Sequence, residues 1–170
     1  MVDGGEEELV RFCGRVQPKL VSTLALYLCD VGVAEELAQE ALVRAWERWP
    51  QVSGCASPEA WVYRVAFNLS KSVLRRRRLE RRHLRRSGPE PGTAAPEVTD
   101  RLAVRDALAA LPPRQRAAVV LRYLADFGVE DTALAMRCAP GTVKALTTQA
   151  LAKLADRFQV DDPEGADIHG

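Results

Sequence analysis

Residues 57–86 place aromatic, amide, hydroxyl and cationic side chains together in one stretch, SPEAWVYRVAFNLSKSVLRRRRLERRHLRR. This mixture suits unpaired nucleic-acid bases, because aromatic rings stack on any base while amides, hydroxyls and ammonium groups reach base edges or phosphates. An ordinary buried helix followed by a solvated basic run has the same composition, since runs of charge are commonly only solvated. The segment by itself leaves both interpretations open.

The same residues predict a helix that begins at Pro58. Ser57 is a favourable N-cap, Pro58 fits the first helical position, and Glu59 adds an acidic first turn. Apolar residues at helical spacing should face a core, namely Trp61, Val62, Val65, Leu69 and Val73. A second stripe should be partly exposed, and together with the polar residues beside it consists of Tyr63, Phe67, Asn68, Ser70, Lys71, Ser72 and Leu74.

Positive charge is concentrated in the second half of this stretch. Residues 71–86 contain nine lysines and arginines and one glutamate, although the whole chain has a net charge of only +1. The flanking residues 1–70 and 87–100 are both net acidic. Such a block indicates contact with a polyanion at one defined place rather than general basicity.

The composition is that of a globular protein, with 47% hydrophobic and 28% charged residues in a chain of 170. No apolar run has membrane-spanning length, and the acidic N-terminus lacks the basic start of a secretory signal, so we expect a cytoplasmic protein without membrane insertion. Neither a metal nor a cofactor is expected. The cysteines lack the paired spacing of a zinc site and are interpreted mainly as packed thiols, with a redox role left open: Cys13, Cys29, Cys55 and Cys138.

Two further helices should precede this segment and form a three-helix domain with it, over residues 1–86. Apolar spacing predicts the first helix over residues 6–28, bent or interrupted at Pro18. It predicts the second over residues 34–49, followed by a loop over residues 51–56. The predicted base-binding helix therefore rests on two amphipathic helices.

Residues 87–100 should form a flexible linker, because they contain several prolines and glycines and no aromatic residue. A second helical domain is expected over residues 101–160, followed by an acidic tail over residues 161–170. Within it, predicted helices over residues 129–136 and 140–158 are separated by a three-residue turn, the helix-turn-helix pattern in which the second helix enters the major groove. The predicted fold class is all-α, with two small helical domains.

Three motifs, in their order along the chain, resemble those of the extracytoplasmic-function sigma factors, the smallest members of the sigma-70 class of bacterial transcription initiation factors. Residues 34–46, AEELAQEALVRAW, look like the helix that docks on the β′ clamp helices of core RNA polymerase. The polymerase contacts that this resemblance implies are Glu36, Leu37, Gln39, Glu40, Arg44 and Trp46.

Residues 61–68, WVYRVAFN, look like the segment that melts the minus-ten promoter element and captures a flipped base. The residues after it resemble the part that holds the strand and the adjacent duplex. The minus-ten contacts implied in this way are Trp61, Tyr63, Arg64, Asn68, Ser70, Lys71, Arg75, Arg76 and Arg78. The chemistry is consistent, because promoter opening needs cations on phosphates and a pocket for the extrahelical base.

Residues 111–116, LPPRQR, and residues 141–144, GTVK, resemble the domain that reads the minus thirty-five element. With Val143 in the buried stripe, helical geometry turns Ala145 and Gln149 outward. The minus thirty-five contacts that the resemblance implies are Arg114, Arg122, Gly141, Thr142, Lys144, Ala145, Thr148 and Gln149.

The second domain departs from the family pattern at its turn and on its recognition helix. Arg137 stands where the family commonly has Gly, and Ala139 where it often has Ser, which weakens turn geometry and helix capping. Family members tend to carry arginines at the positions of Leu146, Gln149 and Leu151. The sequence therefore predicts weak binding to the minus thirty-five element.

These observations predict a sigma factor that binds core RNA polymerase and promoter DNA, has no catalytic activity of its own, and is held by an anti-sigma factor, as family members usually are. A helix-turn-helix regulator that acts without polymerase explains residues 101–158 but leaves the docking helix unused. A helical RNA-binding adaptor explains the basic run alone. An enzyme is the least supported reading, because His83 and His169 have no nucleophile, metal or phosphate-loop constellation around them in the sequence.

Overall fold

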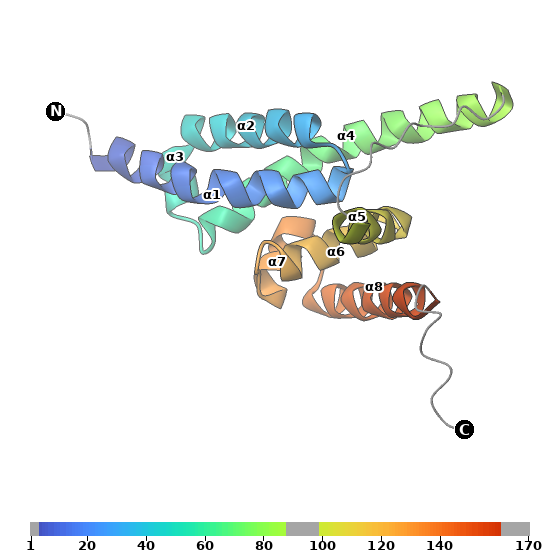
Figure 1. Ribbon diagram of the computed structural model, residues 1–170. Coiled ribbons are helices and arrows are strands. Elements are labelled where there is room, and N and C mark those ends of the chain that lie inside the picture. Colours follow the sequence, from blue (N-terminus) through green and yellow to red (C-terminus); the bar gives the residue numbers. More distant parts are fainter. Residues whose placement is uncertain (1–3, 88–98, 161–170) are drawn as a thin grey trace.

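The computed structural model describes residues 4–87 and 99–160, and within these ranges the chain is helical, with no β-strand (Figure 1). The helices are α1 (Gly4–Leu28), α2 (Val31–Glu47), α3 (Trp49–Ser53), α4 (Pro58–Ser87), α5 (Thr99–Ala110), α6 (Pro113–Tyr123), α7 (Val129–Met136) and α8 (Pro140–Val160). The predicted all-α fold class is confirmed. We refer to residues 4–87 as the first segment and to residues 99–160 as the second segment.

In the first segment, α1 and α2 lie side by side and α4 packs against both (Figure 1). The apolar stripe predicted for α1 is buried, and consists of Leu9, Phe12, Val16, Leu20, Leu24 and Tyr27. The inward face of α2 is a row of fully buried alanines, Ala34, Ala38, Ala41 and Ala45. Small side chains allow neighbouring helices to approach closely. Larger side chains of α2 are thereby left for its outer surface.

Pro18 and Pro50 both lie within helices. Pro18 does not interrupt α1, which is continuous across it, because a proline removes only one hydrogen-bond donor from a long helix. Helix α2 ends at Glu47, two residues before its predicted end, so Pro50 is not the residue that ends it. Pro50 lies instead in the first turn of the short helix α3, where its fixed φ is favourable, so the predicted loop over residues 51–56 begins as a helix.

The second segment contains the predicted helix-turn-helix. Helix α7 has the predicted bounds, and α8 begins at Pro140 as expected. Val143 and Ala150 anchor α8 in the core of this segment with no exposed surface. Arg137, in the turn between the two helices, has a φ of 54° and thus the left-handed conformation that Gly adopts most readily.

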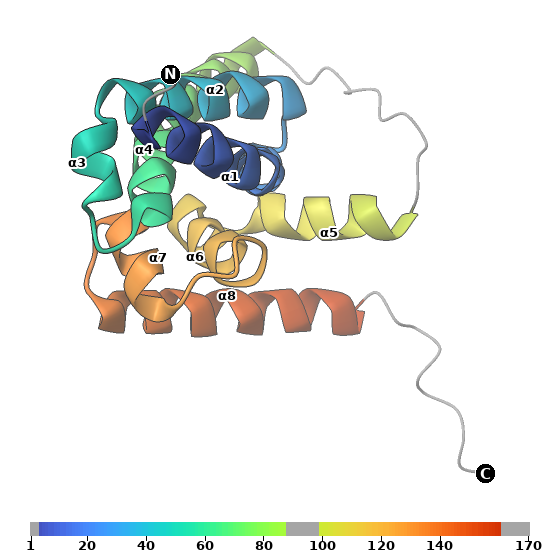
Figure 2. The same ribbon diagram turned by 90° about the vertical axis from the view of Figure 1, so that its left-hand side faces the viewer.

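The two segments pack against each other. Helix α7 lies on α4, while α5 and α6 lie on α1 (Figure 2). At the centre of the contact, the ring of Tyr63 on α4 meets the ring of Phe127 with centroids 4.7 Å apart. Both residues are buried, so the two segments share part of one apolar core.

Three arginines from three helices bind consecutive carbonyl groups at the C-terminal end of α1. Arg116 of α6 donates to Tyr27 O at 2.8 Å, Arg77 of α4 to Leu28 O at 2.6 Å, and Arg105 of α5 to Cys29 O at 2.8 Å. These carbonyls have no partners within their own helix, and the helix dipole gives this end a partial negative charge. Two of the three arginines belong to the second segment, so this cluster also joins the segments.

The predicted linker falls mostly on residues 88–98, and the predicted acidic tail on residues 161–170; both lie outside the described residues. Thr99 and Asp100, at the end of the predicted linker, belong to α5. Among the helices of the described residues, none combines the length and the hydropathy needed to cross a membrane.

Candidate polymerase-binding and DNA-binding surfaces

The residues predicted to contact polymerase lie on the outer side of α2, and we call them the docking face. All are exposed except Leu37, which is half-buried: Glu36, Leu37, Gln39, Glu40, Arg44 and Trp46. Trp46 has 65% of its surface exposed, which is unusual for an indole ring and marks a surface that a partner could cover. Glu40 and Arg44 form an ion pair of 2.9 Å one turn apart, which orders the charged part of this face.

Two grooves border the docking face. Toward α1, Gln39 and Trp46 line an apolar groove of 580 Å³ together with Val10, Cys13 and Val43. Burial raises the pKa of the Cys13 thiol, so this side chain is held in its neutral form and contributes to the apolar lining. Toward α4, Glu40 and Arg44 line a second, smaller groove. The docking face is therefore flanked by a groove toward α1 on one side and by a groove toward α4 on the other.

On α4, Asn68 and Lys71 are exposed and adjacent. The ammonium group of Lys71 donates to Asn68 Oδ1 at 2.9 Å, which leaves the amide NH₂ group of Asn68 turned away from that bond. Ser70 is buried and donates its hydroxyl to Ala66 O at 2.8 Å, one turn earlier in the same helix. Of Asn68, Ser70 and Lys71, only Asn68 and Lys71 therefore have polar groups available to a nucleic acid.

The expectation that Tyr63 and Phe67 form a partly exposed stripe is wrong. Tyr63 is 1% exposed and Phe67 5%, whereas Trp61 is only half-buried. The buried side of α4 is rotated toward these two rings because neighbours cover both of them: Phe127 lies on Tyr63, and Tyr27 lies on Phe67 with centroids 4.6 Å apart. Burial raises the pKa of Tyr63 to about 12, so its phenol stays neutral.

Trp61 and Arg64, also predicted as minus-ten contacts, are half-buried on the side of α4 near the α3–α4 loop. Both side chains line a small apolar pocket of 200 Å³ with Cys55 and with Leu134 of α7. Leu134 is 51% exposed although it sits beside this pocket. The second segment thus reaches the edge of the surface predicted to bind the minus-ten element.

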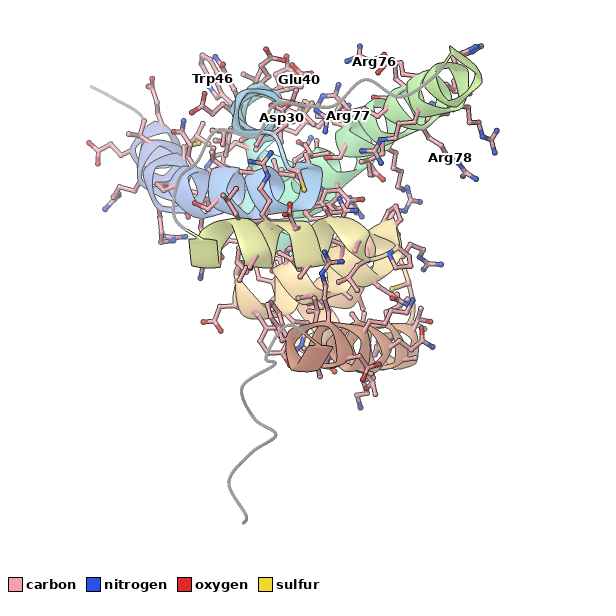
Figure 3. All side chains as sticks on the ribbon, turned by 45° about the vertical axis from the view of Figure 1, so that its right-hand side comes forward. Asp30, Glu40, Trp46, Arg76, Arg77 and Arg78 are labelled. Carbon is pink, nitrogen blue, oxygen red and sulfur yellow. The ribbon has the colours of Figure 1, made fainter. Side chains whose placement is uncertain are left out.

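The arginine run divides into one structural side chain and several exposed ones (Figure 3). Arg77 is half-buried and forms an ion pair of 2.6 Å with Asp30, in addition to its bond to Leu28 O. Arg75, Arg76 and Arg78 are exposed on α4, whose C-terminal part extends beyond the rest of the molecule (Figure 1). Arg76 makes only a surface ion pair of 3.6 Å with Glu80. The exposed arginines are thus free to neutralise phosphates.

Asp30 also positions the docking face, because it caps α2. Its Oδ1 accepts the backbone N–H of Val33 at 3.0 Å, and its Oδ2 accepts from Arg77. This cap explains why α2 begins at Val31 rather than at Ala34 as predicted. The N–H group of Val33 is the main reason why the pKa of Asp30 lies below its ordinary value, and Arg77 contributes in the same direction.

Helix α8 lies on the side of the second segment that is away from the first segment (Figure 2). We call its residues predicted to contact DNA the recognition face. All are exposed except Thr142, which is half-buried: Gly141, Thr142, Lys144, Ala145, Thr148 and Gln149. Leu146 and Thr147 are half-buried between this face and the core, as the helical geometry predicts. Lys144 supplies the one cation of the face.

The two arginines of α6 predicted to contact DNA differ in position. Arg114 is exposed in the first turn. Arg122 is half-buried and donates to Phe127 O, so it holds the turn that presents Phe127 to the first segment. Gln115, between them in the LPPRQR motif, was not predicted as a site residue. It is buried and donates from Nε2 to Gln149 Oε1 at 3.0 Å. The sequence signal that could have pointed to Gln115 was a polar residue at the start of an otherwise apolar helix face.

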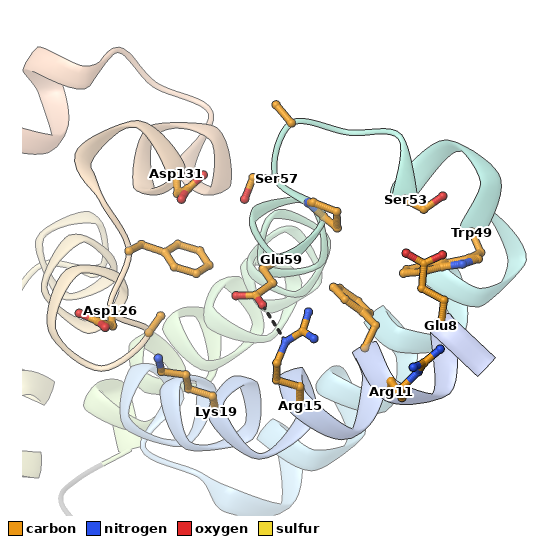
Figure 4. Close-up of a pocket in the computed structure, with 15 residues that line it drawn as sticks. Glu8, Arg11, Arg15, Lys19, Trp49, Ser53, Ser57, Glu59, Asp126 and Asp131 are labelled. Carbon is orange, nitrogen blue, oxygen red and sulfur yellow. Dashed lines mark hydrogen bonds and ion pairs between the residues drawn. The ribbon is translucent and has the colours of Figure 1, made fainter. Parts of the chain in front are cut away.

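A cleft of 920 Å³ runs between the segments (Figure 4). On its α1 side, Arg15 pairs with Glu59 at 3.4 Å and lies over the ring of Phe12 at 5.7 Å from its centroid. The second segment contributes Asp126 and Asp131 to the opposite wall. The cleft is open and carries both signs of charge, and its lining contains neither cysteine nor histidine. The cleft thus marks part of the boundary between the two segments.

Comparisons with known proteins identify both segments. The family model described as Sigma-70 region 2 matches residues 12–80, and the one described as Sigma-70, region 4 matches residues 101–154. The first match contains the docking face and the predicted minus-ten residues up to Arg78. The second contains the helix-turn-helix and the recognition face.

Curated relatives agree with these matches. The chain is 33% identical over 159 residues to the RNA polymerase sigma-E factor of Streptomyces antibioticus, which covers 92% of this chain and 86% of the relative. It is also 33% identical over 134 residues to the ECF RNA polymerase sigma factor EcfG of Rhodopseudomonas palustris, covering 77% of this chain and 74% of the relative.

Solved structures show the same fold. The sigma factor RpoE of Bartonella quintana, crystallised in complex with the anti-sigma factor NepR, has a TM-score of 0.75 at 25% identity, covering 91% of this chain and 99% of that one. CnrH, solved in complex with the cytosolic domain of CnrY, has a TM-score of 0.68 at 19% identity, covering 94% of this chain and 92% of that one. Both likenesses extend over the two segments.

Proposed function

The chain belongs to the sigma-70 family as an extracytoplasmic-function RNA polymerase sigma factor, and from this premise we propose which of its surfaces carry out transcription initiation. The docking face of α2 binds core RNA polymerase, the exposed residues of α4 bind the minus-ten element, and the recognition face of α8 binds the minus thirty-five element. A sigma factor initiates transcription without catalysing a reaction, so the chain is not an enzyme.

The docking face carries the first part of the proposal. Its outward residues include an exposed indole, an ordered Glu40–Arg44 pair and flanking carboxylates, while the inward face of the same helix is packed against α1. Exposed aromatic rings surrounded by charged side chains are typical of protein interfaces, where the ring supplies binding energy and the charges supply specificity. The β′ clamp helices are the partner that the family assignment supplies.

For minus-ten binding, Asn68, Lys71 and the exposed arginines support the proposal. An amide and an ammonium group lie side by side on α4, and the cations continue along the helix toward its free end. Phosphate contacts there would supply affinity, while Asn68 and Lys71 would reach bases as the strands separate. Tyr63 could stack on a base only after Phe127 leaves it, so its predicted contact needs the two segments to move apart.

We further propose that the chain works as two domains, residues 1–86 and 101–160, joined by a linker over residues 87–100 and followed by a tail over residues 161–170. The separate matches to region 2 and region 4 support this division. RpoE was solved in complex with the anti-sigma factor NepR, and CnrH in complex with the cytosolic domain of CnrY. By that analogy, we propose that an anti-sigma factor controls this chain and that it acts in the cytoplasm.

Run-off transcription with purified core RNA polymerase tests the function directly. We expect transcripts of defined start only when the chain is added, from templates selected out of a library of promoter-length DNA. A helix-turn-helix regulator without sigma activity would bind DNA but give no chain-dependent transcript. Core polymerase that neither binds the chain nor initiates with it would contradict the proposal.

A further inference from the structure

Gln115 differs from the other buried polar side chains of the described residues. Thr23, Ser70 and Thr132 donate their hydroxyls to carbonyl groups of their own helix or its cap, one turn earlier, at 2.7, 2.8 and 2.8 Å. Such local bonds satisfy a hydroxyl wherever it is buried. Gln115 instead donates to Gln149 on another helix. Its partner belongs to the recognition face.

Stability does not explain why a glutamine occupies this position. Only 8% of Gln115 is exposed, and its Oε1 is buried with no hydrogen-bond partner. A buried carbonyl without a partner is unfavourable, whereas an apolar side chain of the same length would fill the site without that cost. The polar group is therefore better explained by its effect on Gln149 than by its contribution to the core.

The bond orients the amide of Gln149. Its Oε1 is turned toward α6, where it accepts the Nε2 hydrogen of Gln115. The two ends of a planar amide point in opposite directions, so the Nε2 group of Gln149 is turned away from α6. The neighbouring exposed side chains on this face, Ala145 and Thr148, are small and leave room for a base-pair edge.

This orientation changes which base the glutamine can read. A freely rotating glutamine binds adenine with both amide atoms, because its oxygen accepts from N6 and its nitrogen donates to N7. When the oxygen is held on the inner side, the amide offers the groove two N–H donors. Guanine presents two acceptors there, O6 and N7, whereas adenine presents one acceptor and one donor.

We propose that Gln115 is a positioning residue that fixes the Gln149 amide as a hydrogen-bond donor, so that the protein prefers guanine over adenine at the base pair facing Gln149. This inference rests on the proposed role of α8 at the minus thirty-five element. Gln115 itself touches no DNA in this arrangement; it acts through the rotamer of its partner.

Selection of promoters by the reconstituted holoenzyme tests the inference. The template library carries a randomised minus thirty-five element, and the full-length chain is compared with Gln149→Ala, Gln115→Met and Gln115→Glu. The position read by Gln149 is the one whose base preference disappears in Gln149→Ala. At that position we expect the unmodified chain to favour guanine over adenine roughly tenfold, the size expected for one good bidentate contact.

The two Gln115 variants should change this preference in different ways. Gln115→Met removes the donor, so the Gln149 amide rotates freely and can bind adenine with both of its atoms; the preference for guanine should be lost, and the ratio of guanine to adenine should fall to about one or below. Gln115→Glu offers an acceptor instead, which would turn the Gln149 oxygen outward and favour adenine or cytosine, whose exocyclic amines donate. Gln149→Ala in the Gln115→Met background should remove any remaining preference for adenine and should weaken binding of guanine no further, because Gln115 affects guanine only through Gln149.

Each result is decisive once thermal unfolding shows the variant to be folded. A buried glutamate can prevent folding. If Gln115→Glu does not fold, the result of Gln115→Met alone tests the inference. A tenfold preference for guanine that survives in Gln115→Met overturns the inference, as does a preference of the unmodified chain for adenine or cytosine. Failure of the proposed function is seen separately, because then no chain, the unmodified one included, would select a minus thirty-five element or direct initiation.

Discussion

The recognition face of α8 is open to solvent, whereas part of the corresponding surface on α4 is covered by the other segment. On α8 every predicted contact is exposed except the half-buried Thr142. On α4, Tyr63 lies under Phe127, Ser70 is bonded to its own helix, and the neighbouring Arg77 is paired with Asp30. The comparison teaches that a motif can locate a DNA-binding helix without determining which of its side chains are accessible.

The contact between the segments gives the largest expected effect. Phe127→Ala should lower the free energy of unfolding by about 3–5 kcal/mol, because it removes a buried ring and leaves a cavity beside Tyr63. The measurement is denaturant unfolding of the full-length chain. Tyr123→Ala removes an aromatic ring of the same segment that is 58% exposed, and should cost much less. Equal losses in the two variants would mean that the segments are not held together by this contact.

The docking face offers the next test, since it is a part of the first segment that the second segment leaves uncovered. Glu40→Lys should weaken binding to core RNA polymerase by about 2 kcal/mol, or roughly thirtyfold in Kd, because it reverses a charge within the proposed interface. Fluorescence titration of core polymerase with labelled protein measures the change. Asp106→Lys, an exposed charge reversal on α5, is the matched control. A similar loss of affinity in both variants would mean that binding depends on the net charge of the protein and not on the docking face.

The open part of α4 can be tested without moving the segments. Asn68→Ala and Lys71→Ala should each slow opening of duplex promoters roughly tenfold, the loss expected when one charge-assisted or amide contact of about 1.4 kcal/mol is removed. On templates already unpaired over the minus-ten element the same variants should differ little from the unmodified chain, because the cost of unstacking has been removed. Equal losses on both templates would indicate a folding defect.

Asp30 supports the docking face through a charge that depends on pH. Asp30→Asn keeps the cap but loses the ionic bond to Arg77, and should cost about 1 kcal/mol or less, as for other partly exposed pairs. The folded pKa of Asp30 is lowered, so its contribution is present above the ordinary Asp pKa of about 3.9 and is lost as the pH falls through the lower folded value. The stability difference between the two proteins, measured from pH 6 to pH 2, should therefore shrink only below roughly pH 4. A difference that shrinks between pH 6 and pH 5 would contradict this origin.

The smallest effect is expected at the turn before the recognition helix. Arg137→Gly should raise the free energy of unfolding by about 0.5–1 kcal/mol, because the residue has a left-handed φ of 54° that costs less for Gly. Thermal unfolding measures it. Asp126→Gly is a parallel test, because Asp126 is the other left-handed non-glycine residue among the described residues of the second segment, with a φ of 60°. Both substitutions should stabilise the folded protein. Destabilisation by Arg137→Gly would mean that the Arg137 side chain makes a contact that stabilises the fold by more than its left-handed φ costs.

Local sequence signals predicted much of this protein. The apolar spacing of α1, the Ser57–Pro58 start of α4 and the three-residue turn before Pro140 all agree with the structure. Each depends on interactions within a few residues, such as a cap, a fixed φ or the side of a helix. The order of the docking, minus-ten and minus thirty-five motifs was enough to indicate the family.

Contacts between distant residues decided the rest. Whether Tyr63 is exposed depends on Phe127, 64 residues away, and whether Arg77 is free depends on Asp30. The partner of Gln115 lies on α8, two helices further along the chain. Helical spacing says which side chains share a face, but not which face another segment will cover. That choice is set by the packing of whole helices, because burial and pairing energies become favourable only once the distant partner is in place.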